Sequence, residues 1–182
     1  MKKQIAIFCG SHKAANPLFE IEIEKLGALM ARQGRTLIYG GSNKGYMGTI
    51  SNPFVAADGE IVAIIPNLFP NEVIYSQPAT KLVVVENMQQ RKQLMLQQAD
   101  AFIALPGGVG TLDELTEILS AIQLGLNHQP VALLNIEGFF DPFLQQLQLM
   151  VSEGLMKQEL YNTILVAPTP PEVLDKIDGW NN

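Results

Sequence analysis

The sequence predicts an α/β protein with a doubly wound parallel sheet. Short apolar segments of β-type composition alternate along the chain with amphipathic helical patterns. The apolar segments are hydrophobic throughout, as are strands that helices cover on both faces. No repeat, low-complexity tract or change of composition divides the 182 residues. We therefore expect residues 1–182 to form a single Rossmann-like domain.

Strands and helices are expected to alternate along the whole chain. The predicted strands are Gln4–Cys9, Thr36–Tyr39, Ile61–Ile65, Leu82–Val85, Ala101–Leu105, Val131–Leu134 and Thr163–Val166. The predicted helices are Pro17–Arg32, Met47–Ala57, Met88–Ala99, Thr111–Leu124, Phe140–Glu153 and Pro171–Ile177, with Gly34, Gly59 and Gly125 as stop signals. Pro53 falls inside the second helix, where it costs a backbone hydrogen bond unless it lies in the first turn. The start of that helix is therefore left open.

The composition excludes several classes of protein. Hydrophobic residues make up 47% of the chain and charged residues 16%, which is too apolar for disorder. No apolar run approaches the roughly eighteen residues that span a bilayer. The formal net charge of −6 argues against a broad nucleic-acid surface but allows a local basic pocket for one phosphate. We expect a small-molecule ligand, and neither a nucleic acid nor a membrane as partner.

Cysteine and histidine usage favours a cytoplasmic protein without a metal site. The single cysteine, Cys9, excludes an internal disulfide framework. The two histidines, His12 and His128, form no cluster with zinc-ligand spacing. The apolar stretch Ile5–Cys9 is too short for the core of a signal peptide, and no small-residue cleavage site follows it. A cytoplasmic location is therefore expected.

Four turns at one edge of the predicted sheet are the places to search for a ligand. In doubly wound sheets, ligands bind beyond the carboxyl ends of the strands. The relevant turns follow Cys9, Tyr39, Val85 and Leu105. The longest irregular stretch, Pro66–Lys81, carries three prolines and is expected to be a surface loop near the site.

The turn after Leu105 is a predicted phosphate cradle. It reads Pro106-Gly107-Gly108-Val109-Gly110-Thr111 and leads directly into a helical pattern. Glycines let backbone N–H groups approach a ligand, and a helix N-terminus favours an anion. The alternative is a turn that only joins strand to helix. The loop lacks the Gly-Lys-Ser/Thr of a Walker A motif, and Asp113 stands where the dinucleotide motif has a small residue, so ATP hydrolysis and NAD binding are both disfavoured.

Two further turns belong to the same edge of the sheet. The segment Gly40–Gly48 is glycine-rich and contains one charge, Lys44, although such a turn serves packing about as often as binding. Cys9-Gly10-Ser11 forms another loop. Cys9 itself is expected to be a buried small hydrophobe rather than a nucleophile.

Helical geometry selects one acidic and one basic residue as candidate catalytic residues. At about 100° per residue, Glu114 borders the apolar stripe of its helix, whereas Asp113 and Glu117 point nearly opposite. The same construction places Arg91 inside the apolar stripe of the helix Met88–Ala99, with Lys92 at its margin. A charge on a buried stripe needs a partner, so Arg91 is expected to face a carboxylate or a phosphate; the alternative is an arginine that snorkels to solvent.

Taken together, these motifs resemble the LOG family, the cytokinin riboside 5′-monophosphate phosphoribohydrolases, which have also been called lysine decarboxylase-like. The resemblance runs nearly from end to end. It rests on Cys9-Gly10-Ser11, on Tyr39-Gly40-Gly41 through Met47-Gly48, on Met88 with Arg91-Lys92, on Pro106–Thr111 with Glu114, and on Gln123-Leu124-Gly125.

The resemblance implies a homodimer that hydrolyses the N-glycosidic bond of AMP or a cytokinin riboside monophosphate, with no cofactor. It implies Arg91 and Glu114 as the essential pair. The residues that it implies for substrate binding are Gly10, Ser11, Gly41, Glu72, Met88, Lys92, Gly107, Gly108, Val109, Gly110, Thr111, Leu112, Asp113 and Ser120. The chain departs from the family pattern at Gln89, Gln90, Ser42, Tyr46 and Asp113, which leaves the identity of the base, adenine or N6-modified adenine, open.

Two other functions compete with phosphoribohydrolase activity. A lysine decarboxylase would need pyridoxal phosphate on a desolvated lysine, and no lysine of the chain stands in such a context. A nucleotide-binding or carrier protein of the same fold without catalysis is the stronger rival, because fold alone does not determine function.

Overall fold

A computed structural model describes residues 3–69 and 79–180 of the chain. These residues form one sheet of seven strands in the order β4-β3-β2-β1-β5-β6-β7, with every neighbouring pair parallel. The predicted doubly wound parallel sheet is thereby confirmed. The strands are β1 Gln4–Phe8, β2 Thr36–Tyr39, β3 Ile61–Pro66, β4 Lys81–Val85, β5 Ala101–Ala104, β6 Val131–Leu134 and β7 Ile164–Ala167.

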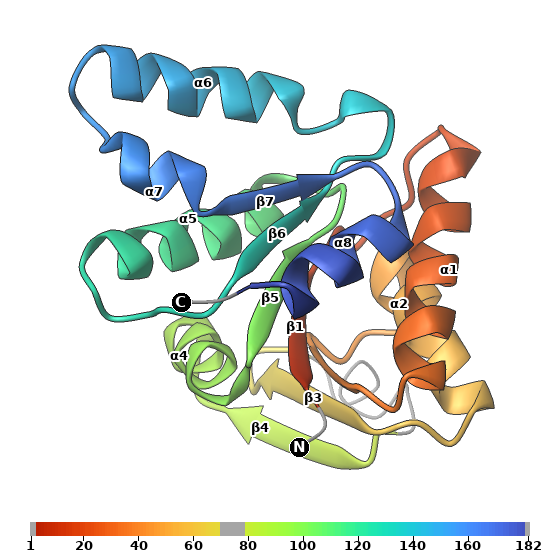
Figure 1. Cartoon of the computed structure of the whole chain (residues 1–182). Helices are drawn as coiled ribbons and strands as arrows, with labels where there is room; N and C mark the ends of the chain where they lie inside the picture. Colours follow the sequence, from red (N-terminus) through yellow and green to blue (C-terminus); the bar gives the residue numbers. More distant parts are fainter. Residues whose placement is uncertain (1–2, 70–78, 181–182) are drawn as a thin grey trace.

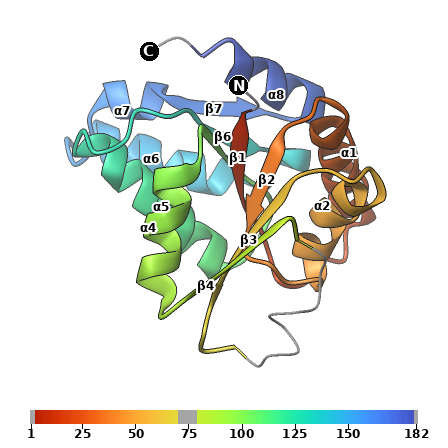
Figure 2. The same cartoon turned by 90° about the horizontal axis from the view of Figure 1, so that it is seen from below.

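Helices cover both faces of the sheet (Figures 1 and 2). On one face lie α1 Pro17–Arg32, α2 Gly45–Ala56 and α8 Pro170–Asp178. On the other lie α4 Met88–Gln98, α5 Val109–Gln123, α6 Asp141–Ser152 and α7 Gln158–Asn162. Each face has its own hydrophobic core, because successive residues of a strand point to opposite sides of the sheet. In β1, for example, Ile5 and Ile7 enter the first core, and Ala6 and Phe8 the second.

The order of the strands places a binding crevice beyond the carboxyl ends of the two central strands, β1 and β5. The chain builds outward from β1 to β4, returns to the centre for β5 beside β1, and then builds outward to β7. The loops after β1 and β5 therefore leave the sheet in opposite directions, and a crevice forms where they separate.

Helix starts follow the signals that the sequence carries. Asn16 caps α1 by accepting a hydrogen bond from the Leu18 N–H, and Pro17 occupies the first turn. Asn87 caps α4 in the same way by accepting from the Gln90 N–H. The second cap matters for the site, because it fixes the start of the helix that carries Arg91.

The structure corrects three details of the sequence-based expectations. The helices α2 and α5 begin two residues earlier than expected, at Gly45 and Val109. Pro53 therefore lies well inside α2, where α2 packs against α1 so closely that a Cβ on Gly27 would be 2.6 Å from the Ile50 carbonyl oxygen. The short helices α7 and η1, Ile136–Gly138, were not expected, because elements of five and three residues carry no readable periodicity. None of the helices in the described part of the chain is long and apolar enough to cross a membrane.

Candidate active site

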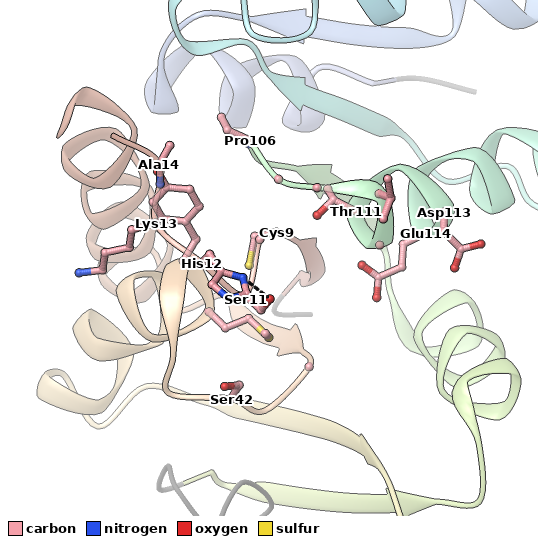
Figure 3. A pocket seen from close by; sticks show the side chains of 18 of the residues that line it. Cys9, Ser11, His12, Lys13, Ala14, Ser42, Pro106, Thr111, Asp113 and Glu114 are labelled. Atoms are coloured by element: carbon pink, nitrogen blue, oxygen red, sulfur yellow. Dashed lines mark hydrogen bonds between the residues drawn. The ribbon is translucent and has the colours of Figure 1, made fainter. Parts of the chain in front are cut away.

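A cavity of about 690 Å³ opens at the carboxyl edge of the sheet (Figure 3). Its walls come from the four turns that the sequence singled out. Residues 9–14 follow β1, Gly40 and Ser42 follow β2, Met88 follows β4, and residues 106–111 follow β5. The predicted convergence of these turns on one cavity is observed.

Close backbone packing holds three of these loops together. The Tyr46 N–H donates a hydrogen bond to the Gly10 carbonyl oxygen at 3.1 Å, which ties the start of α2 to the loop after β1. A Cβ on Gly107 would lie 2.9 Å from the Gly10 nitrogen, so the loop after β5 also needs glycine to approach the loop after β1. The cavity therefore has a rigid floor of backbone.

The glycine loop after β5 presents open backbone to the cavity. A Cβ on Gly108 or on Gly110 would meet no heavy atom within 4 Å in the described residues. The loop leads into α5, whose first turn leaves N–H groups without acceptors inside the helix. Thr111 is 3% exposed, and its hydroxyl has no hydrogen-bond partner among the described residues. Free N–H groups, a positive helix end and an unpaired hydroxyl suit an anionic oxygen ligand.

A buried ion pair forms another wall of the cavity. Arg91 Nη2 of α4 donates to Glu114 Oε1 of α5 at 2.7 Å, and the two side chains are only 12% and 7% exposed. Gly40 makes room for this guanidinium, because a Cβ there would lie 2.7 Å from Nη2. Arg91 Nε has no partner within the part of the chain that is described, so the arginine keeps donor capacity for a ligand.

The burial of Glu114 changes its acidity. Removal of water from around the carboxylate raises its pKa to about 6, and this effect outweighs the attraction of the Arg91 guanidinium, which lowers it. The carboxylate is therefore charged at neutral pH, although its burial makes the charged form less stable than it would be in water. A group of this kind is typical of a functional site.

A second ion-pair cluster adjoins the cavity. Lys92 contacts Asp113 at 3.0 Å and also pairs with Glu117. The hydrogen bond to Glu117 is the first cause of a raised Lys92 pKa. Lys92 lines a small adjoining hollow rather than the main cavity. Asp113 is exposed on the side of α5 opposite the apolar stripe, as expected, and it also lies on the rim of the main cavity.

The structure gathers most of the remaining candidate residues. Those that line the main cavity are Gly10, Ser11, Met88, Gly107, Gly108, Val109, Gly110 and Thr111. Leu112 is partly buried against the second core. Ser120 is exposed on α5, about 9 Å along the helix axis from Glu114. Gly41 does not line the cavity. It is needed for the backbone conformation, because its φ is +76° and Ile65 occupies the space that a side chain would take. Glu72 lies outside the described residues.

Sequence reasoning missed several lining residues that lie beyond the glycine motifs. They are His12, Lys13, Ala14, Phe19, Phe69 and Phe139, whereas Ser42, Tyr46 and Met47 also line the cavity but belong to the Gly40–Gly48 segment that the sequence singled out. Phe19 and Phe139 meet edge to face at 5.6 Å and give one part of the cavity an apolar surface. Only the position of His12 and Lys13 directly after Gly10-Ser11 was a signal for them, whereas Phe139 is brought in by η1 from a distant part of the chain.

Cys9 lies in the cavity wall but is a weak nucleophile. Burial raises the pKa of its thiol far above the usual range, the negative charge of Glu114 adds to this, and Arg91 only partly offsets it. The thiol therefore stays protonated, in agreement with the expectation that Cys9 is a small hydrophobic residue.

Comparison with known proteins identifies the family. Residues 47–177 match the family model described as "Possible lysine decarboxylase". The chain is 38% identical over 179 residues to the cytokinin riboside 5′-monophosphate phosphoribohydrolase LOG of Oryza sativa subsp. japonica. The matched region covers 98% of this chain and 74% of the relative. The chain belongs to the LOG family. A second LOG-family relative, the cytokinin riboside 5′-monophosphate phosphoribohydrolase LOG1 of Arabidopsis thaliana, is 34% identical over 98% of this chain and 84% of its own length.

Solved structures agree with the LOG-family fold. A molybdenum cofactor binding protein from Rippkaea orientalis superposes with a TM-score of 0.73 at 25% identity, over 98% of this chain and 96% of that one. The molybdenum cofactor carrier protein of Chlamydomonas reinhardtii superposes with a TM-score of 0.70 at 18% identity, over 98% and 97% of the two chains, and shows the fold alone.

Proposed function

We propose that the chain hydrolyses the N-glycosidic bond of a purine riboside 5′-monophosphate, releasing the free base and ribose 5-phosphate. The base is adenine or an N6-modified adenine, as in cytokinin activation. The observation that carries the proposal is the buried Arg91–Glu114 pair, which shares one cavity with an open glycine loop at a helix N-terminus. The names of the LOG-family relatives support the same reaction.

The 5′-phosphate is assigned to the loop after β5. Backbone N–H groups at Gly108–Gly110 and the Thr111 hydroxyl can surround its oxygens, and the helix dipole of α5 favours its charge. A nucleotide anchored in this way places its ribose between the glycine loop and the Arg91–Glu114 pair.

The proposed mechanism is a dissociative cleavage. As the C1′–N9 bond breaks, the ribose gains oxocarbenium character, and a negative charge beside it lowers the barrier. Glu114 binds the ribose hydroxyls, stabilises that cation and accepts a proton from the attacking water. Arg91 orients Glu114 through the 2.7 Å hydrogen bond. The purine lies toward the apolar part of the cavity formed by Phe19, Phe139 and their neighbours.

Pyridoxal phosphate chemistry does not fit the lysines at the site. A lysine that forms a Schiff base needs a lowered pKa and a desolvated setting. Lys92 has a raised pKa because Glu117 and Asp113 hold its charge. Lys13 is half exposed and paired with Glu20. Neither is suited to hold that cofactor, and the reaction proposed above uses none.

Incubation with nucleotides separates the enzyme from the rival carrier function. A panel of AMP, N6-isopentenyl-AMP and GMP is incubated with the protein while free base is detected and binding is measured by calorimetry. The proposal predicts release of free base from one or both adenine nucleotides. Tight binding of an intact nucleotide without release would instead establish a binding or carrier protein, the role for which the two molybdenum cofactor proteins of this fold are named.

We further propose a homodimeric, cytoplasmic protein. Leu124 and Leu126 follow α5 and are 69% and 71% exposed, and Leu155 is 76% exposed. Exposed apolar side chains of this size suit an interface with a second copy through α4, α5 and the segments next to them. Light scattering at micromolar concentration tests this: a dimer mass is expected, and a monomer mass would contradict it.

A further inference from the structure

The imidazole of His12 lines the cavity and has no role in the mechanism above. It lies on the side of the cavity opposite Thr111 and Glu114 (Figure 3). Its backbone is held in place, because a Cβ on Gly45, the first residue of α2, would be 2.5 Å from the His12 nitrogen. His12 is therefore part of the wall that faces Glu114 across the ligand space, with its backbone packed against α2 and its side chain exposed.

A hydrogen bond orients the imidazole ring. Ser11 Oγ lies 3.1 Å from His12 Nδ1, and both residues line the cavity. With Nδ1 engaged by a neighbouring hydroxyl, Nε2 is the ring nitrogen that is left for a ligand. Orientation of one imidazole nitrogen by a partner on the other is the usual arrangement for a histidine that transfers a proton.

The proposed cleavage needs a proton donor on the base side. When the C1′–N9 bond breaks, its electron pair goes to the purine, which is a poor leaving group unless a ring nitrogen is protonated. Glu114 and Arg91 are bonded to each other on the ribose side. Lys13 is paired with Glu20, and Asp113 with Lys92.

The two other donors of the cavity are less suited than His12. Burial raises the pKa of the Cys9 thiol far above neutrality, which makes it too weak an acid. The Tyr46 hydroxyl accepts a hydrogen bond from the Ala14 N–H at 2.9 Å, and a phenol is a much weaker acid than an imidazolium. An imidazole, in contrast, gains and loses a proton readily near neutral pH.

We propose that His12 is the general acid that protonates the departing purine. The proposal rests on the phosphoribohydrolase function above. In this step the His12 Nε2–H bond breaks and an N–H bond forms on the purine, while the electron pair of the C1′–N9 bond passes to the base. Water adds to C1′, its proton goes to Glu114 or solvent, and solvent reprotonates His12.

Leaving-group dependence tests this role. The substitution His12→Asn keeps a polar group beside Ser11 but cannot deliver a proton. The variant is assayed on AMP and on 4-nitrophenyl β-ribofuranoside 5-phosphate, whose 4-nitrophenolate leaves without a proton. We expect kcat/KM for AMP to fall about a hundredfold or more, and kcat/KM for the nitrophenyl substrate to change by less than about threefold. The matched control is His128→Asn, in the only other histidine of the sequence, which is exposed after α5 and outside the cavity lining.

The assays on the two substrates separate a general acid from a residue that only positions the ligand. An equal loss on both substrates would show that His12 only positions the ligand, and full activity of the variant on AMP would show that it has no role; either result overturns the proposal. If the wild-type protein releases product from neither substrate, the phosphoribohydrolase function fails, and the role of His12 falls with it. A selective loss on AMP, with wild-type behaviour of His128→Asn, supports the assignment.

Discussion

Removal of the negative charge of Glu114 should abolish most of the turnover while leaving nucleotide binding intact. Glu114→Gln keeps the size of the side chain and one acceptor for the 2.7 Å hydrogen bond from Arg91. What it removes is the attraction between a carboxylate and the cationic ribose of the transition state.

The magnitude follows from the burial of the pair. Two unit charges about 4 Å apart attract by roughly 4 kcal/mol at the effective dielectric of about 20 that suits partly buried sites. The partial charge of the ribose and the opposing charge of Arg91 reduce this to about 2.7 kcal/mol, which corresponds to about a hundredfold in rate. We therefore expect kcat on AMP to fall about a hundredfold or more, with little change in the dissociation constant.

The partner residue should behave as part of the same unit. Arg91→Ala leaves a buried carboxylate without its orienting partner, so turnover should fall to a similar extent. The double variant should cost little more than either single one, because residues that act together are not additive.

The assay is the release of ribose 5-phosphate from AMP, with circular dichroism to verify that each variant is folded. Glu153→Gln is the matched control, an exposed glutamate at the end of α6 and outside the cavity lining. Retention of more than about a third of wild-type turnover by Glu114→Gln would refute the electrostatic role of this residue.

Three further results are expected. Because burial raises the pKa of Glu114 from 4.5 to about 6, the free energy of unfolding should fall by about 2 kcal/mol as pH rises through this window, and denaturant titrations of Glu114→Gln should lack this step. Gly107→Ala should lower the melting temperature by several degrees because its Cβ would be 2.9 Å from the Gly10 nitrogen, whereas Gly108→Ala should keep the wild-type melting temperature but weaken AMP binding about tenfold. AMP should be turned over far faster than adenosine, and equal rates would show that the loop after β5 has another role.

The sequence was a good guide to the fold because local and global signals agree in this chain. Apart from Gln4 and Thr36, which begin β1 and β2, the strands β1, β2, β3, β5 and β6 are apolar and buried, so composition alone distinguishes them from the helices between them. The edge strand β4 was recognised although Leu82 and Val84 are exposed, since it keeps its β-branched composition. Helix boundaries at Gly45 and Val109 were missed by two residues because glycines precede or form the first turn there.

The site was predictable only where the motif lies at the end of a strand. Arg91 and Glu114 were paired from two helical wheels and the common sheet edge, and the structure places them 2.7 Å apart. Side chains that reach the cavity from other elements gave no such signal, as Phe139 of the segment after η1 illustrates. The helical wheel placed Asp113 on the exposed side of its helix, but it could not show that the first turn of α5 adjoins the cavity, so that Asp113 reaches the rim.

Product analysis of AMP after incubation with the protein tests the central claim most directly. Chromatography with mass detection distinguishes cleavage at C1′–N9 from cleavage at the phosphate ester and from no reaction. The account predicts free adenine and ribose 5-phosphate in equal amounts from the wild-type protein, and almost none from Glu114→Gln. Adenosine with inorganic phosphate, or AMP recovered intact from every adenine nucleotide tried, would contradict it.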